Sequence, residues 1–316
     1  LLEVKSNIIN QSMQITSNEM IKPISSMFGN EYNRLIYNGN SLASLIEGNL
    51  FSIENGNRHN LCCDVGLITS YQAEIRDNTF NTDAPDTETR YGWFIESNES
   101  VISGNTYSMV SRGRYPGGFI MTSGSENNRS LVENNTVTST SYYPLETWNN
   151  NKGFINLYGY TDFINNNINI TSQANYNWVP GIIYVKGEGN TITGNTIYSS
   201  QYYSSGVYFQ DATNQIFTNN EIYSERGSSA IKISNSDVLI SHNLIESQVR
   251  GIEMSNQSGG EIINNTIVSP NSADYGIYIS DLTMPVVQNN IVEGFANGIY
   301  AENDLQNQFI QNNNLW

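Results

Sequence analysis

The sequence is poor in charged residues and in long apolar runs. Only 14% of its 316 residues are charged, and 30 acidic against 14 basic side chains give a formal net charge of −16 at pH 7. Nucleic acid and anionic membrane surfaces are therefore poor partners, because both repel negative charge. A polyanionic glycan stays open as a ligand, since binding depends on local rather than net charge. No apolar run is long enough to predict membrane insertion.

Cysteine and histidine are too few to predict a metal centre of the Cys/His type. The two cysteines, Cys62 and Cys63, are neighbours, and a disulfide between adjacent residues is strained, so we expect one to face inward and the other outward. The two histidines, His59 and His242, lie far apart. His242 directly precedes an asparagine of the repeat described next, so we expect it to be a turn residue.

The chain is dominated by an asparagine phrase that recurs every 22 to 25 residues in its C-terminal third. The repeated asparagines are Asn195, Asn220, Asn243, Asn265, Asn290 and Asn313. Between them falls a second phrase, Gly-Ile-x-Ile, as at 251–254 and 276–279. The short alternating apolar runs, separated by Asn, Gly and Ser, predict strands and turns without helix. A period of this length predicts that each unit is one coil of a solenoid.

These phrases resemble the right-handed parallel β-helix repeats of the pectate-lyase-like superfamily. The asparagine phrase extends backward through earlier positions, namely Asn167, Asn135, Asn105, Asn78, Asn49 and Asn10. The resemblance implies an all-β fold, a solenoid of about eleven coils with three short strands each. At the turn between the second and third strands, the asparagines would tolerate left-handed backbone and stack their amides into a ladder.

We expect residues 1–316 to form a single parallel β-helix domain. Its parts would be irregular N-terminal coils over 1–60, coils with long corner loops over 61–205, and regular coils over 206–316. The chain does not begin with Met and ends within a rung. It is therefore expected to be a mature or trimmed form, and either part of a larger protein or covered at its end by self-association.

Five insertions lengthen the coils between 78 and 205, each after a third strand and before the next first strand. They are Asn81–Tyr91, Ser108–Gly117, Ser139–Lys152, Ser172–Pro180 and Ser199–Ser205. All leave the coil at one corner, so we expect a wall of loops beside the first-strand sheet, where binding residues gather. The wall is rich in aromatic rings, which either pack the loops onto the solenoid or bind the apolar faces of sugars. The binding candidates are Trp93, Tyr143, Trp148 and Trp178.

Strand alternation predicts which first-strand residues face outward. In Gly-Ile-x-Ile both Ile side chains face the core and x faces solvent. The predicted outward column is Phe94, Met121 or Ile120, Asn156, Tyr184, Tyr208, Lys232, Glu253, Tyr278 and Tyr300. A parallel column two residues further along includes Glu96, Tyr158, Lys186 and Gln210. Lys232 and Glu253 should therefore be neighbours on adjacent rungs, and we expect Tyr158, Tyr184 and Tyr208 to contact a ligand.

The resemblance implies that the groove over this sheet is where polysaccharide lyases and related hydrolases act. A lyase needs a base to take the proton next to a uronate carboxylate, and a cationic group, often Ca²⁺, to neutralise that carboxylate. Lys186, Lys232 and Arg250 are the candidate bases, with Glu253 beside Lys232. The alternative interpretation of Lys232 and Glu253 is a surface ion pair worth less than about 1 kcal/mol.

A hydrolase would need two carboxylates about 5–9.5 Å apart across the groove. Three acidic residues of the first corner loop, Asp83, Asp86 and Glu88, are the candidates on one side, with Glu96, Glu146 or Asp162 opposite. The same three are weak candidates for a Ca²⁺ site with oxygen ligands, and otherwise form a solvated acidic loop. The polygalacturonase signature does not continue after Asp83, and no lyase signature is reproduced.

Three classes of function follow from the sequence. The first is a secreted or cell-surface polysaccharide-active enzyme, a lyase more than a hydrolase, in which a base and a charge neutraliser converge in the groove. The second is a non-catalytic glycan-binding or adhesive module, with aromatic rings but no such convergence. The third is a structural spike or fibre component such as a phage tailspike, with subunit contacts on its outer faces.

Overall fold

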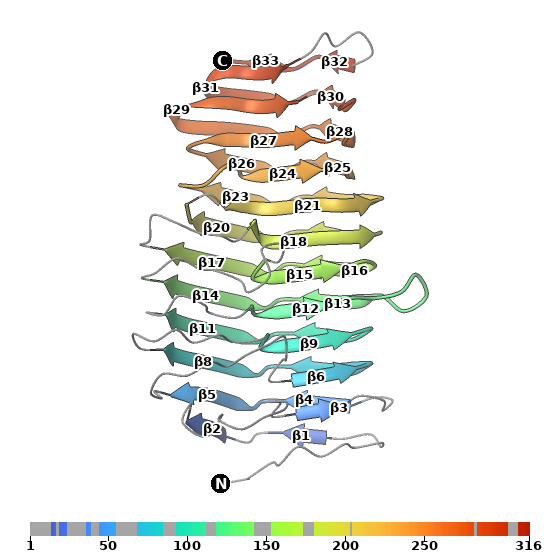
Figure 1. Cartoon of the computed structure of the whole chain (residues 1–316), viewed down its shortest axis with the longest axis vertical. Helices are drawn as coiled ribbons and strands as arrows, with labels where there is room; N and C mark the ends of the chain where they lie inside the picture. The colour runs from blue at the N-terminus through green and yellow to red at the C-terminus, as the bar shows by residue number, and fades with distance from the viewer. Residues whose placement is uncertain are drawn as a thin grey trace.

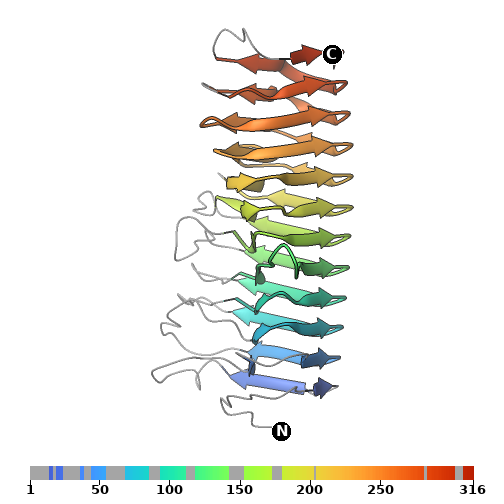
Figure 2. The same ribbon diagram turned by 90° about the vertical axis from the view of Figure 1, so that its right-hand side faces the viewer.

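The computed structural model describes residues 14–16, 19–23, 36–38, 44–54, 68–84, 93–111, 118–141, 153–172, 180–202, 204–280, 283–302 and 309–316. These residues form short strands and turns, stacked along one axis from the N-terminal to the C-terminal end (Figure 1). Seen from the side, the strands of successive coils lie above one another (Figure 2). No helix of the described segments is suited to crossing a membrane.

Each coil contributes strands in three positions, and each position stacks in parallel on the next coil. The second strands form a separate sheet: β1 (Gln14–Thr16), β4 (Ser44–Glu47), β7 (Ala73–Arg76), β10 (Val101–Ser103), β13 (Ser130–Glu133), β16 (Thr161–Ile164), β19 (Thr191–Thr193), β22 (Gln215–Thr218), β25 (Asp237–Ser241), β28 (Gly259–Ile263), β30 (Val286–Gln288) and β32 (Phe309–Gln311). Its 12 strands come from successive coils, against the predicted count of about eleven coils.

The first and third strands complete the coils. The first strands are β3 (Ile36–Asn38), β6 (Ile68–Tyr71), β9 (Ile95–Asn98), β12 (Ile120–Thr122), β15 (Ile155–Tyr158), β18 (Gly181–Glu188), β21 (Ser205–Thr213), β24 (Ile231–Ser234) and β27 (Arg250–Ser255). The third strands are β2 (Glu19–Pro23), β5 (Leu50–Glu54), β8 (Thr79–Ala84), β11 (Thr106–Ser111), β14 (Thr136–Ser141), β17 (Asn167–Ser172), β20 (Thr196–Ser200), β23 (Glu221–Ser224), β26 (Leu244–Ser247) and β33 (Asn314–Leu315). Near the C-terminus, β29 (Thr266–Ile279) and β31 (Ile291–Ala301) each run through both positions without a break, which joins the two stacks. The fold is an all-β, right-handed parallel β-helix, as predicted.

The core is a stack of apolar side chains from alternate strand positions. In β24, Ile231 and Ile233 are fully buried, whereas Lys232 between them faces outward. Toward the N-terminus, aromatic rings form part of this stack. Phe51, Phe80 and Tyr107 lie parallel there, with centroids 4.7 Å apart for Phe51 and Phe80 and 4.8 Å apart for Phe80 and Tyr107. Such burial supplies the main stabilisation of the coil, because each rung removes several large apolar side chains from water.

The asparagine ladder runs unbroken through the described coils. Each side-chain nitrogen donates to the side-chain oxygen of the next member, in the order Asn49, Asn78, Asn105, Asn135, Asn166, Asn195, Asn220, Asn243, Asn265, Asn290 and Asn313. The prediction of Asn167 as a member was wrong. Asn166 is 2% exposed and bonded in the ladder, whereas Asn167 begins β17 and faces solvent. Asn10 lies outside the described residues.

The left-handed residue of this turn also lies one position earlier than predicted. Positive φ angles occur just before the ladder asparagines, for example 55° at Asn134, 55° at Asn219 and 57° at Asn264. His242 takes the same place with a φ of 56°, so the prediction that it is a turn residue is confirmed. The ladder asparagine itself is thus free to place its amide inside the coil. Cys62, Cys63 and His59 lie outside the described residues.

Candidate functional site

The outward column of the first-strand sheet is formed largely in the predicted order, although Asn156 and Tyr184 are buried there rather than exposed to solvent. Across adjacent rungs the strand register pairs, in order, Asn156, Tyr184, Tyr208, Lys232, Glu253, Tyr278 and Tyr300. Met121, not Ile120, precedes Asn156. At the next rung the prediction was wrong: Phe94 is buried in the core, and Glu96 pairs with Met121. The Gly-Ile-x-Ile pattern falls two residues later than predicted, because Ile95 and Ser97 are the inward residues of β9.

Three charged side chains meet at the middle of this column. The Nζ of Lys232 lies 3.4 Å from Oε1 of Glu253, and Nη1 of Arg250 lies 3.0 Å from Oε2 of the same carboxylate. The side chain of Glu253 is only 11% exposed, and those of the two cations are about one-third exposed. We call these three residues the charged cluster. With two cations and one carboxylate, the cluster carries one excess positive charge on an otherwise acidic protein.

Tyrosine rings adjoin the charged cluster on its N-terminal side. The centroids of Tyr158 and Tyr184 are 6.2 Å apart, those of Tyr184 and Tyr208 are 5.9 Å apart, and both pairs meet edge to face. Lys232 then places its Nζ 5.8 Å from the centroid of Tyr208. Tyr184 is the most enclosed of the three at 2% exposed, and burial raises its pKa to about 12. Tyr158 and Tyr208 are therefore the rings here that a ligand can reach.

A second group of tyrosines adjoins the cluster on its C-terminal side. The rings of Tyr275, Tyr278 and Tyr300 have centroids 5.0 to 5.7 Å apart. The guanidinium of Arg250 lies over two of them, 4.5 Å from the centroid of Tyr278 and 5.5 Å from that of Tyr275. The Tyr278 hydroxyl donates to Glu302, which together with burial raises the pKa of Tyr278 to about 12.

We call the six rings of both groups the tyrosine strip, composed of Tyr158, Tyr184, Tyr208, Tyr275, Tyr278 and Tyr300. Sequence reasoning placed Tyr278 and Tyr300 in the column but missed Tyr275. The strand register pairs Tyr275 with Arg250 and Asn297 rather than with members of the column. Its ring reaches the strip from this neighbouring position, and the Gly-Ile-x-Ile phrase carries no signal for such a contact.

Other predicted site residues lie elsewhere. Lys186 pairs with Asp211 at 3.4 Å, and both side chains are nearly half exposed, so Lys186 is separate from the charged cluster. Trp93 is 5% exposed, and a Cβ added at Gly118 would lie 1.7 Å from its ring, which shows that the ring packs over that glycine. Little of Trp93 is therefore available to a ligand.

The hydrolase candidates are not brought together among the described residues. Asp162 lies on β16 of the second-strand sheet and accepts two hydrogen bonds from Arg129, at 2.8 and 2.6 Å. It thus faces away from the first-strand column, on which Glu96 lies. The other hydrolase candidates fall outside what the structure describes, namely Glu146, Asp86, Glu88 and the side chain of Asp83. So do three aromatic binding candidates, namely Tyr143, Trp148 and Trp178.

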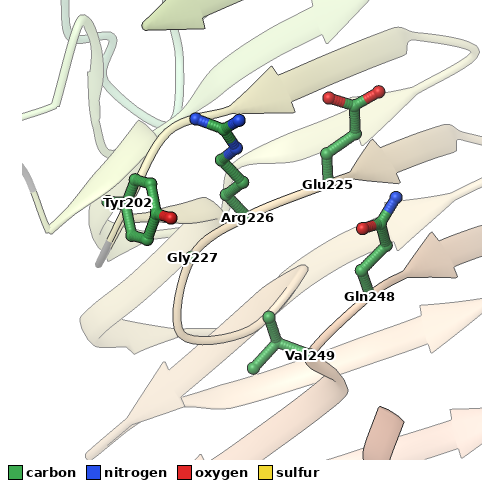
Figure 3. A pocket seen from close by; sticks show the side chains of 6 residues that line it. All are labelled: Tyr202, Glu225, Arg226, Gly227, Gln248 and Val249. Atoms are coloured by element: carbon green, nitrogen blue, oxygen red, sulfur yellow. The ribbon is translucent and has the colours of Figure 1, made fainter. Parts of the chain in front are cut away.

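A hollow of about 580 Å³ opens at the corner between the third and first strands, next to the charged cluster. Figure 3 shows its six lining residues, which are Tyr202, Glu225, Arg226, Gly227, Gln248 and Val249. They come from the turn that follows β20, from the turn between β23 and β24, and from the turn between β26 and β27. Tyr202 belongs to the insertion Ser199–Ser205 of the predicted aromatic wall, whereas sequence reasoning missed the other five residues. The only available signal was the polar Glu225-Arg226-Gly227 interruption after a third strand.

Comparison with known proteins agrees with the fold. Residues 181–316 match the family model of the right handed beta helix region. The A-module of the mannuronan C-5 epimerase AlgE4 from Azotobacter vinelandii superposes with a TM-score of 0.52 at 10% identity, over 94% of this chain and 90% of that one. The A-module of AlgE6 from the same organism gives a TM-score of 0.47 at 8% identity, over 96% and 90%.

A third similar structure is tailspike protein 3 of bacteriophage CBA120, with a TM-score of 0.44 and 11% identity. The match covers 88% of this chain and 53% of the tailspike, so the chain spans about half of the tailspike's length. No curated protein matches the sequence. At 10% identity the likeness to the AlgE4 module shows the fold alone, and a fold of this kind hosts many activities.

Proposed function

We propose that this right-handed parallel β-helix repeat protein binds a polysaccharide lengthwise along its first-strand sheet, over the tyrosine strip and the charged cluster. The observation that carries the proposal is the succession of tyrosines and charged side chains along the helix axis, of which Tyr208, Lys232, Tyr278 and Tyr300 are accessible to solvent. From Tyr184 to Tyr300 the column climbs five rungs. At about 4.8 Å per rung this is about 24 Å, which is long enough for several sugar units.

The side chains of the strip suit a sugar polymer. Tyrosine offers an apolar ring to the C–H face of a sugar and a hydroxyl to its rim. The excess positive charge of the charged cluster favours a polymer that carries acidic groups, because charge complementarity is local. The AlgE modules are named for mannuronan, but their likeness supports only the fold, so this proposal rests on the strip. We also propose that the protein is located outside the cell or at its surface, where long polysaccharides occur.

Binding is better supported than cleavage. A lyase base has to accept a proton from the substrate, whereas both cations of the cluster contact Glu253 instead. A hydrolase needs two cooperating carboxylates, and the cluster contains only Glu253. We therefore propose that the protein is a β-helix that binds a polysaccharide without cleaving it. Cleavage of the polysaccharide is the alternative, and the same experiment measures it.

The test is affinity electrophoresis or calorimetry with a panel of uronate polymers and neutral polysaccharides. Tyr208→Ala and Tyr278→Ala should each weaken binding about tenfold, equal to about 1.4 kcal/mol, through loss of a stacking ring. Tyr223→Ala is the matched control, because Tyr223 is an outward tyrosine on the third-strand sheet. Absence of binding to every polymer, or an equal loss in the control, would contradict the proposal.

Turnover is read in the same samples from unsaturated ends and from new reducing ends. New unsaturated ends that disappear in Lys232→Ala would establish a lyase at the charged cluster. Reducing ends without unsaturation would indicate hydrolysis and direct attention to Glu96 and Glu253. Binding without either product is the result that we expect.

A further inference from the structure

The turn that forms one wall of the corner hollow is held in place by the coil. The backbone N–H of Glu225 donates to the carbonyl of Ser199 at 2.9 Å, which continues the third-strand pairing into the corner. Gly227 has a φ of 132°, and a Cβ added there would lie 2.2 Å from the carbonyl oxygen of Ser204. Only glycine fits so close an approach in that backbone region. The backbone of this wall is therefore fixed by the fold of the coil.

Arg226 forms no ion pair with a carboxylate within the described part of the chain, although the carboxylate of Glu225 lines the same hollow. Ion pairs there involve five other basic residues, namely Arg76, Arg129, Lys186, Lys232 and Arg250. The Arg226 guanidinium instead lies over the Tyr202 ring, 5.2 Å from its centroid. The adjacent carboxylate of Glu225 is hydrogen-bonded to Tyr198, and burial followed by this bond raises the pKa of Tyr198 to about 12. The fork of Arg226 thus keeps donors for a ligand.

The other walls complement a sugar rather than a bare ion. Val249 and the ring of Tyr202 offer apolar contact, and Gln248 offers an amide that both donates and accepts hydrogen bonds (Figure 3). A volume of about 580 Å³ lies in the range of small-molecule sites. The planar guanidinium of arginine matches a carboxylate with two parallel hydrogen bonds.

We propose that this hollow is a second subsite, which binds a carboxylate-bearing sugar residue at a branch or chain end. Val249 directly precedes Arg250 of the charged cluster, so the hollow opens at the edge of the tyrosine strip. It lies at the corner of the coil, off the line of the outward column, which is why its occupant is a branch or an end rather than the main chain. The idea that the bound sugar belongs to a polymer rests on the proposed function. The binding of an acidic sugar in the hollow does not depend on it.

The experiment is a ligand-observed NMR titration of the intact protein with methyl glucuronoside and, separately, methyl glucoside. We expect the wild type to bind the acidic sugar about tenfold more tightly than the neutral one. Arg226→Gln should remove that preference, and Arg226→Lys should keep part of it through its charge. Arg76→Gln is the matched control, because Arg76 is a basic residue on the second-strand sheet.

The outcomes separate the subsite from the proposed function. Equal binding of the two sugars, or an unchanged preference in Arg226→Gln, would overturn the subsite. Inorganic phosphate or sulfate that displaces the glucuronoside at equal concentration would also overturn it, because the hollow would then be a general anion site. Tyr208→Ala should weaken polysaccharide binding and leave the glucuronoside unaffected. If no polysaccharide binds while glucuronoside binding depends on Arg226, the proposed function fails and the subsite stands.

Discussion

Replacement of one ladder asparagine should destabilise the protein far more than replacement of the asparagine beside it. The side-chain nitrogen of Asn166 donates three hydrogen bonds, to the carbonyls of Val132 and Ile164 and to the side chain of Asn195, at 3.0 to 3.1 Å. It accepts two more, both at 2.9 Å, from the backbone and the side chain of Asn135. Asn167 is exposed, so Asn167→Ala is the matched control.

The magnitude follows from the groups that Asn166→Ala leaves without partners. The buried backbone N–H of Asn135 loses its acceptor, at a cost of about 1–3 kcal/mol. The side chain of Asn135 keeps two carbonyl acceptors, at Ile102 and Glu133, so its loss is smaller. Together with the three lost donations, we expect unfolding to become easier by about 3 kcal/mol, against less than about 0.5 kcal/mol for Asn167→Ala.

Urea denaturation of the wild type and the two variants measures this difference. Because a solenoid coil contacts chiefly its neighbours, hydrogen exchange should also accelerate more at the Asn135 amide than at the distant Asn265 amide. Equal destabilisation by the two substitutions would refute the assignment of Asn166 to the ladder. Uniform acceleration of exchange along the whole chain would refute its local role.

Three further outcomes can be checked by denaturation. The Tyr107 hydroxyl is buried and has no hydrogen-bond partner among the described residues, so Tyr107→Phe should stabilise the protein by about 1 kcal/mol, and a loss would show that the hydroxyl is satisfied. The pKa of Glu99 is lowered from 4.5, chiefly by the hydrogen bond from Tyr71. The carboxylate therefore stabilises the folded protein above about pH 4.5, and this stabilisation is lost as the pH falls through the lower pKa of the folded state. Glu99→Gln should thus destabilise the protein at pH 7 but not at pH 2. Thermal melts of the wild type and the variant at the two pH values test this. Gly251→Ala should cost at least about 2 kcal/mol, because the new Cβ would lie 2.5 Å from a neighbouring backbone oxygen, whereas Gly259→Ala, with its nearest atom at 3.7 Å, should cost less than about 0.5 kcal/mol.

The regular repeat explains why much of the architecture was predictable. Gly-Ile-x-Ile and the asparagine phrase recur with nearly constant spacing, and alternation then places Lys232 beside Glu253 without further information. Errors occurred where two adjacent residues satisfied the same pattern. Asn166 and Asn167 are identical in type, and a shift of one residue reverses which of them faces inward. Phe94 was misplaced for a different reason, because Gly92-Trp93-Phe94-Ile95 imitates the Gly-Ile-x-Ile phrase two residues before the matching positions of β9.

The sequence by itself determined the β-helix, the asparagine ladder and the column that contains Tyr208, Lys232 and Glu253, because these depend on spacing along the chain. Only the tertiary structure decided which side chains meet across rungs and corners. Arg250 reaches both Glu253 and Tyr278, and Lys186 pairs with Asp211 instead of joining the cluster. The direction of a long side chain depends on its neighbours from other coils, which no linear pattern records.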